Sequence, residues 1–204
     1  MTKENTQGLK PNYIIVSQLI EPNSSVLDLG CGDGTLLKNL VDKKNVKGLG
    51  IEIDQNSVVK SLEKGLQIIQ DNIDNGLKDF EDNQWDYVIL NQTLQSTQKP
   101  DFVIEEMLRI GKKIIVSFPN FAYWRVRFYL FFNGKMPKSD FLPFEWYNTP
   151  NIHLLTINDF FDFCKKRDIT IEKAIYCTKG RKKKSIFRAT ANFFSEEAIF
   201  LISK

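Results

Sequence analysis

The chain has 204 residues, 42% of them apolar and 26% charged, which predicts one folded domain spanning residues 1–204. Its net charge of +3 is too small to indicate a nucleic-acid-binding protein. Three cysteines with no CxxC-type pairing argue against a metal site or a disulfide framework and predict reduced thiols.

Apolar runs and chain breakers predict alternating helices and strands. In chain order we expect a helix at Tyr13–Ile20, a strand at Ser25–Leu29, a helix at Thr35–Val41, a strand at Gly48–Ile53, a helix at Asn56–Lys64, strands at Leu66–Gln70 and Trp85–Leu90, a helix at Asp101–Ile110, a strand at Lys113–Phe118, a helix at Ile157–Arg167 capped by Thr156, and strands at Ile169–Cys177 and Ala198–Ser203. This alternation predicts an α/β fold with a seven-stranded, mostly parallel sheet and helices on both faces. The last two strands have no predicted helix between them, so we expect an antiparallel pair at the edge, around the basic turn Lys179–Lys184.

A glycine-rich loop follows the first strand. Gly30, Gly32 and Gly34 allow a sharp turn and a close approach of the backbone to a ligand. A dinucleotide fingerprint would need glycine in place of Thr35, and a phosphate loop would need Gly-Lys-Ser/Thr. The GxGxG spacing, preceded by Asp28, instead resembles motif I of class I S-adenosylmethionine (SAM)-dependent methyltransferases, whose fold is Rossmann-like. The alternatives are a purely structural turn or a nucleotide site of another kind.

Acidic and amide side chains end the next two strands. Glu52 is placed to accept hydrogen bonds from ribose hydroxyls, as in other Rossmann-type sites. After the third strand, the methyltransferase pattern has Gly-Asp where this chain has Asp71 and Asn72. The expected cofactor is therefore SAM. The predicted cofactor-binding residues are Asp28, Gly30, Cys31, Gly32, Gly34, Glu52, Ile53, Asp71, Asn72 and Asn91.

Residues that could face the transferred methyl group follow the fourth and fifth strands. They are Asn91, Gln92, Thr93, Pro119, Asn120 and Phe121, with His153 beyond them. Catalytic residues stay unknown, and Asn91, Asn120 and His153 are weak candidates, because methyl transfer depends largely on positioning. His153 is the only histidine, and a lone histidine in such a loop is more often a hydrogen-bonded structural residue than a general base. No cluster of His, Asp or Glu suggests a metal.

Five blocks of sequence resemble one family, the methionine biosynthesis protein MetW. They are Ser25–Leu36, Gly50–Asp54, Leu90–Gln95, Val116–Phe121 and Glu145–His153. The resemblance implies a SAM-binding protein of methionine synthesis that associates with homoserine O-acyltransferase. The alternative is an independent SAM-dependent methyltransferase with a small-molecule acceptor, and an RNA-modifying enzyme is a weaker third possibility. Whether the chain is itself an enzyme stays open.

The segment Phe121–Phe132 is apolar almost all round if it is helical. Either a lid formed by Lys135–Pro150 or a partner protein is expected to cover the surface that the sheet does not bury. Two arginines interrupt the segment, which is too short to span a bilayer. Because the first residues also lack a signal-like apolar run, we expect a cytoplasmic protein with no membrane association.

Overall fold

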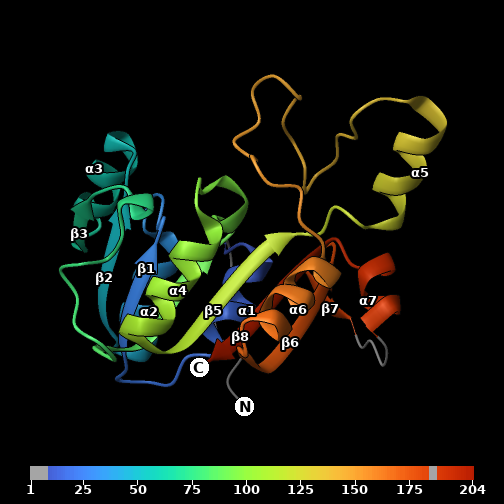
Figure 1. Ribbon diagram of the computed structural model, residues 1–204. Helices are drawn as coiled ribbons and strands as arrows, with labels where there is room; N and C mark the ends of the chain where they lie inside the picture. Colours follow the sequence, from blue (N-terminus) through green and yellow to red (C-terminus); the bar gives the residue numbers. More distant parts are fainter. Residues whose placement is uncertain (1–8, 184–187) are drawn as a thin grey trace, which may run out of the picture.

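One eight-stranded sheet runs through the residues that the computed structural model describes, 9–183 and 188–204 (Figure 1). Its strand order is β3-β2-β1-β4-β5-β8-β6-β7. The strands are β1 (Ser25–Leu29), β2 (Lys47–Glu52), β3 (Gln67–Gln70), β4 (Trp85–Asn91), β5 (Gly111–Pro119), β6 (Thr170–Thr178), β7 (Arg181–Lys183) and β8 (Glu197–Ser203). Strands β1 to β5 are parallel, and β8 lies antiparallel between β5 and β6. The mostly parallel α/β fold is therefore confirmed.

The end of the chain differs from the sequence-based prediction in three ways. The antiparallel pairing of β6 and β8 is confirmed, but the sheet has eight strands rather than seven, because the three-residue β7 pairs with β6 in a hairpin. The pair is not the edge itself, since β8 is inserted beside β5 and leaves β6 and β7 outside it. A short helix, α7 (Arg188–Phe194), precedes β8, although no helix was expected there. Seven residues are too few for a helical periodicity to be recognised in the sequence. The last residue of the expected basic turn, Lys184, lies outside the described residues.

Helices cover both faces of the sheet because successive strand side chains point to opposite sides. The helices are α1 (Pro11–Ser17), α2 (Thr35–Lys44), α3 (Gln55–Glu63), α4 (Pro100–Ile110), α5 (Trp124–Asn133), α6 (Ile157–Lys166) and α7, with short 3₁₀ turns η1 (Ile73–Asn75) and η2 (Leu94–Ser96). Helices α1 and α2 pack on one face, where Ile89 points, and α4 and α6 pack on the other, where Leu90 points. The predicted cap of α6 is confirmed, since Thr156 and Asp159 form a reciprocal capping box.

Helix α5 stands clear of the sheet, at the end toward which β5 points (Figure 1). Only Val126 of this helix is buried, in a small cluster with Tyr123 and Leu142. The segment after α5 thus covers the base of the helix, as a lid would, but leaves most of its apolar surface open. No helix in residues 9–183 and 188–204 is long and apolar enough to cross a membrane.

Candidate functional site

The glycine loop lies between β1 and α2, at the carboxyl edge of the sheet where the strand order reverses between β1 and β4. Gly30, Gly32 and Gly34 have φ values of +66°, +56° and +71°, which favour glycine. A Cβ on Gly30 would lie 2.7 Å from the side chain of Thr93, whereas one on Gly32 would meet nothing within 4 Å. Gly32 therefore presents its backbone to open space, as a close approach to a ligand requires.

The backbone amides of this loop donate hydrogen bonds to other atoms of the protein. Gly30 N and Cys31 N donate to Ile51 O at 2.8 and 3.1 Å, and Gly32 N donates to Glu52 Oε2 at 2.7 Å. A pyrophosphate site needs loop amides that are free to donate to the ligand. The hydrogen bonding here suits a ligand without phosphate, in agreement with the glycine spacing.

Glu52 is fixed by three main-chain donors at the end of β2. Besides Gly32 N, its carboxylate accepts from the amides of Ile53 and Asp54, each at 2.9 Å. The carboxylate lies in a cleft of about 330 Å³. The cleft is lined by Gly30, Ile51, Glu52, Ile53, Asp71, Asn72, Ile73, Asp74, Thr93, Ser96, Thr97, Gln98 and Ile152. Its walls thus combine acceptors for hydroxyl and amino groups with exposed isoleucine side chains.

The side chains after β3 are partly engaged by their own backbone. Asn72 Oδ1 accepts from Asp74 N at 3.0 Å and caps η1, while Asp71 Oδ1 accepts from Asn72 N at 2.6 Å. Both residues line the cleft, and their role in cofactor binding stays a prediction. Asp54 accepts from Ser57 N and caps α3 instead.

Five of the predicted cofactor-binding residues are not among those that line the cleft: Asp28, Cys31, Gly32, Gly34 and Asn91. Asp28 and Cys31 are buried. Burial, and then the nearby charge of Glu52, raise the pKa of Asp28 to about 7. The Cys31 thiol packs where a Cβ on Gly50 would stand, and burial raises its pKa. Cys31 therefore contributes its backbone to the loop, and its side chain is a packed, unreactive thiol.

A polar network joins the ends of β4, β5 and β8. Asn91 Oδ1 accepts from Ser117 Oγ at 2.6 Å, and Gln92 N donates to Ser117 O at 3.0 Å. Gln92 has a φ of +57°, which is uncommon outside glycine and is found where surrounding contacts hold a residue in place. Its Nε2 donates to Glu197 Oε1 at 2.8 Å.

Glu197 is the site residue that the sequence analysis missed. Burial raises its pKa to about 7, although hydrogen bonds with Asn12 and Gln92 act in the opposite direction. The only local signal is a carboxylate at the start of an apolar strand, which is also typical of a solvated strand end. Its partner Gln92 is 105 residues away in the sequence.

Beside the cleft, a cavity of about 810 Å³ lies between the start of α1, the ends of β4 and β5, the start of β8 and the segment after α5. Its lining includes Asn12, Gln92, Gln95, Phe141, Phe144 and Glu197. Ser96 lines both this cavity and the cleft, so the two adjoin.

Two other residues predicted to face the methyl group, Asn120 and His153, lie in different parts of the structure. Asn120 is fully buried, its amide donates to Asn192 O and Ser195 O, and its Oδ1 accepts from Ala122 N and Ile157 N. Such full occupancy corrects the interpretation of Asn120 as a catalytic candidate, because nothing on its side chain is left for a substrate.

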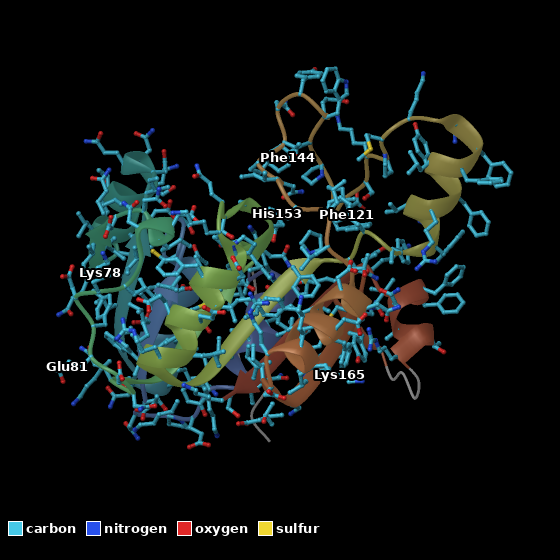
Figure 2. The ribbon with its side chains drawn as sticks, viewed as in Figure 1. Lys78, Glu81, Phe121, Phe144, His153 and Lys165 are labelled. Carbon is cyan, nitrogen blue, oxygen red and sulfur yellow. The ribbon has the colours of Figure 1, made fainter. Side chains whose placement is uncertain are left out.

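His153 lines a separate cavity of about 310 Å³ between α4 and α6, with Leu94 and Phe160 among its neighbours. Its Nε2 is buried and has no hydrogen-bond partner among the described residues. Figure 2 shows His153 and Phe121 at the base of the projecting segment, with Phe144 further out. The structure therefore does not bring His153 to the cavity that holds Glu197.

Within residues 9–183 and 188–204, no three His, Cys, Asp or Glu side chains are grouped so that they could hold a metal ion.

Solved structures with the same fold are SAM-dependent methyltransferases and relatives. A putative SAM-dependent methyltransferase from Listeria monocytogenes has a TM-score of 0.69 and 13% identity, covering 95% of this chain and 98% of that one. A SAM-dependent methyltransferase from Archaeoglobus fulgidus has a TM-score of 0.66 and 14% identity, covering 96% and 92%. The [4+2]-cyclase SpnF has a TM-score of 0.68 and 16% identity, covering 96% and 81%. These similarities establish the class I methyltransferase fold, and the cyclase illustrates that this fold alone does not determine the reaction.

A similar sequence is the bifunctional methionine biosynthesis protein MetXA/MetW of Rhodopirellula baltica, which is 36% identical over 170 residues. The match covers 79% of this chain but only 27% of that protein, so the chain spans about a quarter of its length. Residues 10–202 match the family described as methionine biosynthesis protein MetW. The resemblance expected from the five sequence blocks is thus confirmed, and the chain belongs to the MetW family.

Proposed function

We propose that this chain binds SAM in the cleft beside the glycine loop and acts in methionine synthesis as a partner of homoserine O-acyltransferase. Two observations support the two halves of this proposal. The first is the arrangement of Glu52 against Gly32, and the second is the apolar surface of α5.

The residues of the cleft fit the chemical groups of SAM. Ribose hydroxyls are donors, and Glu52 retains acceptor capacity beyond its three main-chain bonds. The apolar side chains of Ile53 and Ile152, 62% and 58% exposed, suit the faces of an adenine ring. Asp71 and Asn72 supply acceptors for its amino group, while the backbone of Gly32 has room for the amino-acid end of the molecule to pass. When bound, SAM would supply an electrophilic methyl group, and the protein's part would be to hold and orient it.

Calorimetry with SAM and S-adenosylhomocysteine tests this half of the proposal. We expect both to bind with dissociation constants well below about 1 mM, the weak end of specific small-molecule binding. Affinity weaker than millimolar for both would exclude the cleft as a SAM site.

Helix α5 carries the surface that supports a protein partner. Phe131 and Phe132 are 80% and 74% exposed, and Phe128, Tyr129 and Leu130 are each more than 40% exposed. Monomeric proteins seldom leave this much contiguous apolar surface open, and aromatic residues dominate interface hot spots. The relative from Rhodopirellula baltica is named a bifunctional MetXA/MetW protein. This name supports an acyltransferase as the partner that binds the apolar surface of α5.

A pull-down with this chain as bait, using the homoserine O-acyltransferase of the same organism, tests the proposed association. We expect Phe131→Ser with Phe132→Ser to weaken association by at least about 2 kcal/mol, or roughly thirtyfold. Leu62→Ser is the matched control, because Leu62 is 52% exposed on α3, which lies at the opposite end of the molecule from α5 (Figure 1). If the acyltransferase binds the Phe131→Ser, Phe132→Ser double variant as tightly as it binds the Leu62→Ser control, the interface lies elsewhere.

The segment from Gly134 to Leu155 connects the two halves of the proposal. Ile152 N and His153 N donate to Gln95 O at 2.8 and 3.0 Å, and Ile152 lines the cofactor cleft. A ligand in the cleft therefore touches the same segment that covers the base of α5. If SAM acts as a signal of pathway output, saturating SAM should change the dissociation constant of the complex, because only differential affinity shifts an equilibrium. An unchanged constant would exclude this coupling.

A second candidate function is enzymatic: the chain itself would transfer a methyl group to a small molecule. The observation that favours it is the cavity of about 810 Å³ that adjoins the cofactor cleft at the carboxyl edge of the sheet. Incubation with methyl-labelled SAM and a metabolite extract tests it. Label appearing in a new small molecule would support the enzyme, whereas its absence together with a stoichiometric acyltransferase complex would support the partner role.

A further inference from the structure

We propose that the cavity of about 810 Å³ binds a second small molecule through a protonated amine, which Glu197 and Gln95 receive. The proposal deepens the second candidate function by naming a ligand class, and it does not depend on the acyltransferase. It rests on the proposed cofactor site only in that the two spaces adjoin.

Glu197 is a carboxylate without a cationic partner. It is partly buried at the start of β8, and its Oε1 accepts a hydrogen bond from the neutral amide of Gln92. None of the salt bridges among the described residues includes Glu197. A carboxylate that is shielded from water and accepts hydrogen bonds only from neutral donors attracts a cation, because the cation balances its charge.

Gln95 lines the same cavity and carries an acceptor without a partner in the described part of the chain. Its side chain is 5% exposed, and its Nε2 donates to Gln92 O at 2.8 Å. This bond fixes the orientation of the amide, since the reverse orientation would bring two acceptors together. Its Oε1 is buried without a hydrogen-bond partner among the described residues, although Gln95 lines the cavity. Buried acceptors are almost always paired, so this atom calls for a donor.

The rest of the cavity indicates what the amine is attached to. Phe141 and Phe144 line it from the segment after α5, and Pro119 lines it from the end of β5. Aromatic faces stabilise a nearby ammonium group and pack against an apolar body. A primary amine with an apolar or aromatic body therefore fits the lining.

Other charged and titratable groups face the same space, and they matter for its pH dependence. They are Lys10 before α1, Lys179 in the turn between β6 and β7, Cys177 on β6, Asp140 after α5 and Glu196 before β8. Glu196 is already engaged, because its Oε2 accepts from Lys179 N at 2.6 Å. Since burial raises the pKa of Glu197 to about 7, binding of a cation near pH 7 should release part of a proton to the buffer.

Calorimetry on the whole chain, with S-adenosylhomocysteine at saturation, provides the test. The probes are 2-phenylethylamine and its neutral analogue 2-phenylethanol. We expect the amine to bind about tenfold or more tightly than the alcohol, as one charge-assisted hydrogen bond would provide. Repeating the titration at pH 7 in two buffers of different ionisation enthalpy should reveal proton release for the amine alone.

Variants locate the effect. Glu197→Gln keeps the shape and removes the charge, so we expect a loss of about tenfold or more for the amine and less than threefold for the alcohol. Glu172→Gln is the matched control, because it removes the same charge from an exposed position of β6. Gln95→Met serves as a second variant if Glu197→Gln does not fold, with the same expected direction.

Three results would overturn the proposal: equal affinity for the two probes, unchanged amine affinity in the variants, or loss of amine binding when S-adenosylhomocysteine is present. The last would mean that the cofactor's own amino-acid end occupies the cavity. Failure of SAM and S-adenosylhomocysteine to bind, with amine binding intact, would instead refute the proposed cofactor site alone.

Discussion

Replacing Glu52 with alanine removes the side chain that ties the glycine loop to β2. Three main-chain amides lose their acceptor, those of Gly32, Ile53 and Asp54. The amides of Ile53 and Asp54 are exposed and regain hydrogen bonds from water, so their contribution to the loss of stability is small. The amide of Gly32 is partly buried, and its bond of 2.7 Å is short and charge-assisted.

The expected magnitudes follow from this difference. We expect the free energy of unfolding to fall by about 1–2 kcal/mol, which corresponds to a melting temperature lower by about 2–8 °C for a domain of this size. SAM binding should fall further, by about 1.5–3 kcal/mol or roughly 10- to 150-fold, because charged hydrogen bonds to the ribose are also lost.

Calorimetry with SAM and a melting curve without it measure the two effects. Asp54→Asn is the control, since it removes a neighbouring charge while asparagine still caps α3. If folded Glu52→Ala keeps its SAM affinity within threefold of the original chain, the assignment of Glu52 to the ribose is wrong.

Three further predictions concern the loop, the buried acid and the buried amide. Gly32→Val should lower SAM affinity about tenfold or more, since a branched residue is strained at a φ of +56° and fills the space left for the ligand; calorimetry measures this. The folded-state pKa of Asp28, about 7, lies above the value of about 3.9 in an unfolded chain, so the folded state binds a proton that the unfolded state loses. Stability should therefore decline as pH rises from about 4 to 7, and Asp28→Asn should flatten this decline in denaturant titrations. Asn120→Leu should destabilise the chain by about 3 kcal/mol or more, because four main-chain groups lose their partner; wild-type stability in urea would show that the network is dispensable.

The family, the core of the fold and the position of the candidate cleft were predictable from the sequence because their signals are local. The spacing of Gly30, Gly32 and Gly34 indicates three alternate positions at which the backbone requires glycine, and all three have positive φ in the structure. Glu52 ends a strand that pairs with β1, so parallel pairing alone brings it to the loop. Thr156 with Asp159 specifies a helix start within four residues.

Only the tertiary structure decided which polar side chains meet each other. Glu197 reaches Gln92 because β8 is inserted antiparallel beside β5, a placement that no local pattern encodes. Asn120 and His153 looked alike in the sequence as polar residues near the carboxyl edge. One is enclosed by the main chain around α7, and the other turns toward α4 and α6. Burial and hydrogen-bond occupancy depend on chain segments distant in sequence, and they separate a structural side chain from one that is free to meet a ligand.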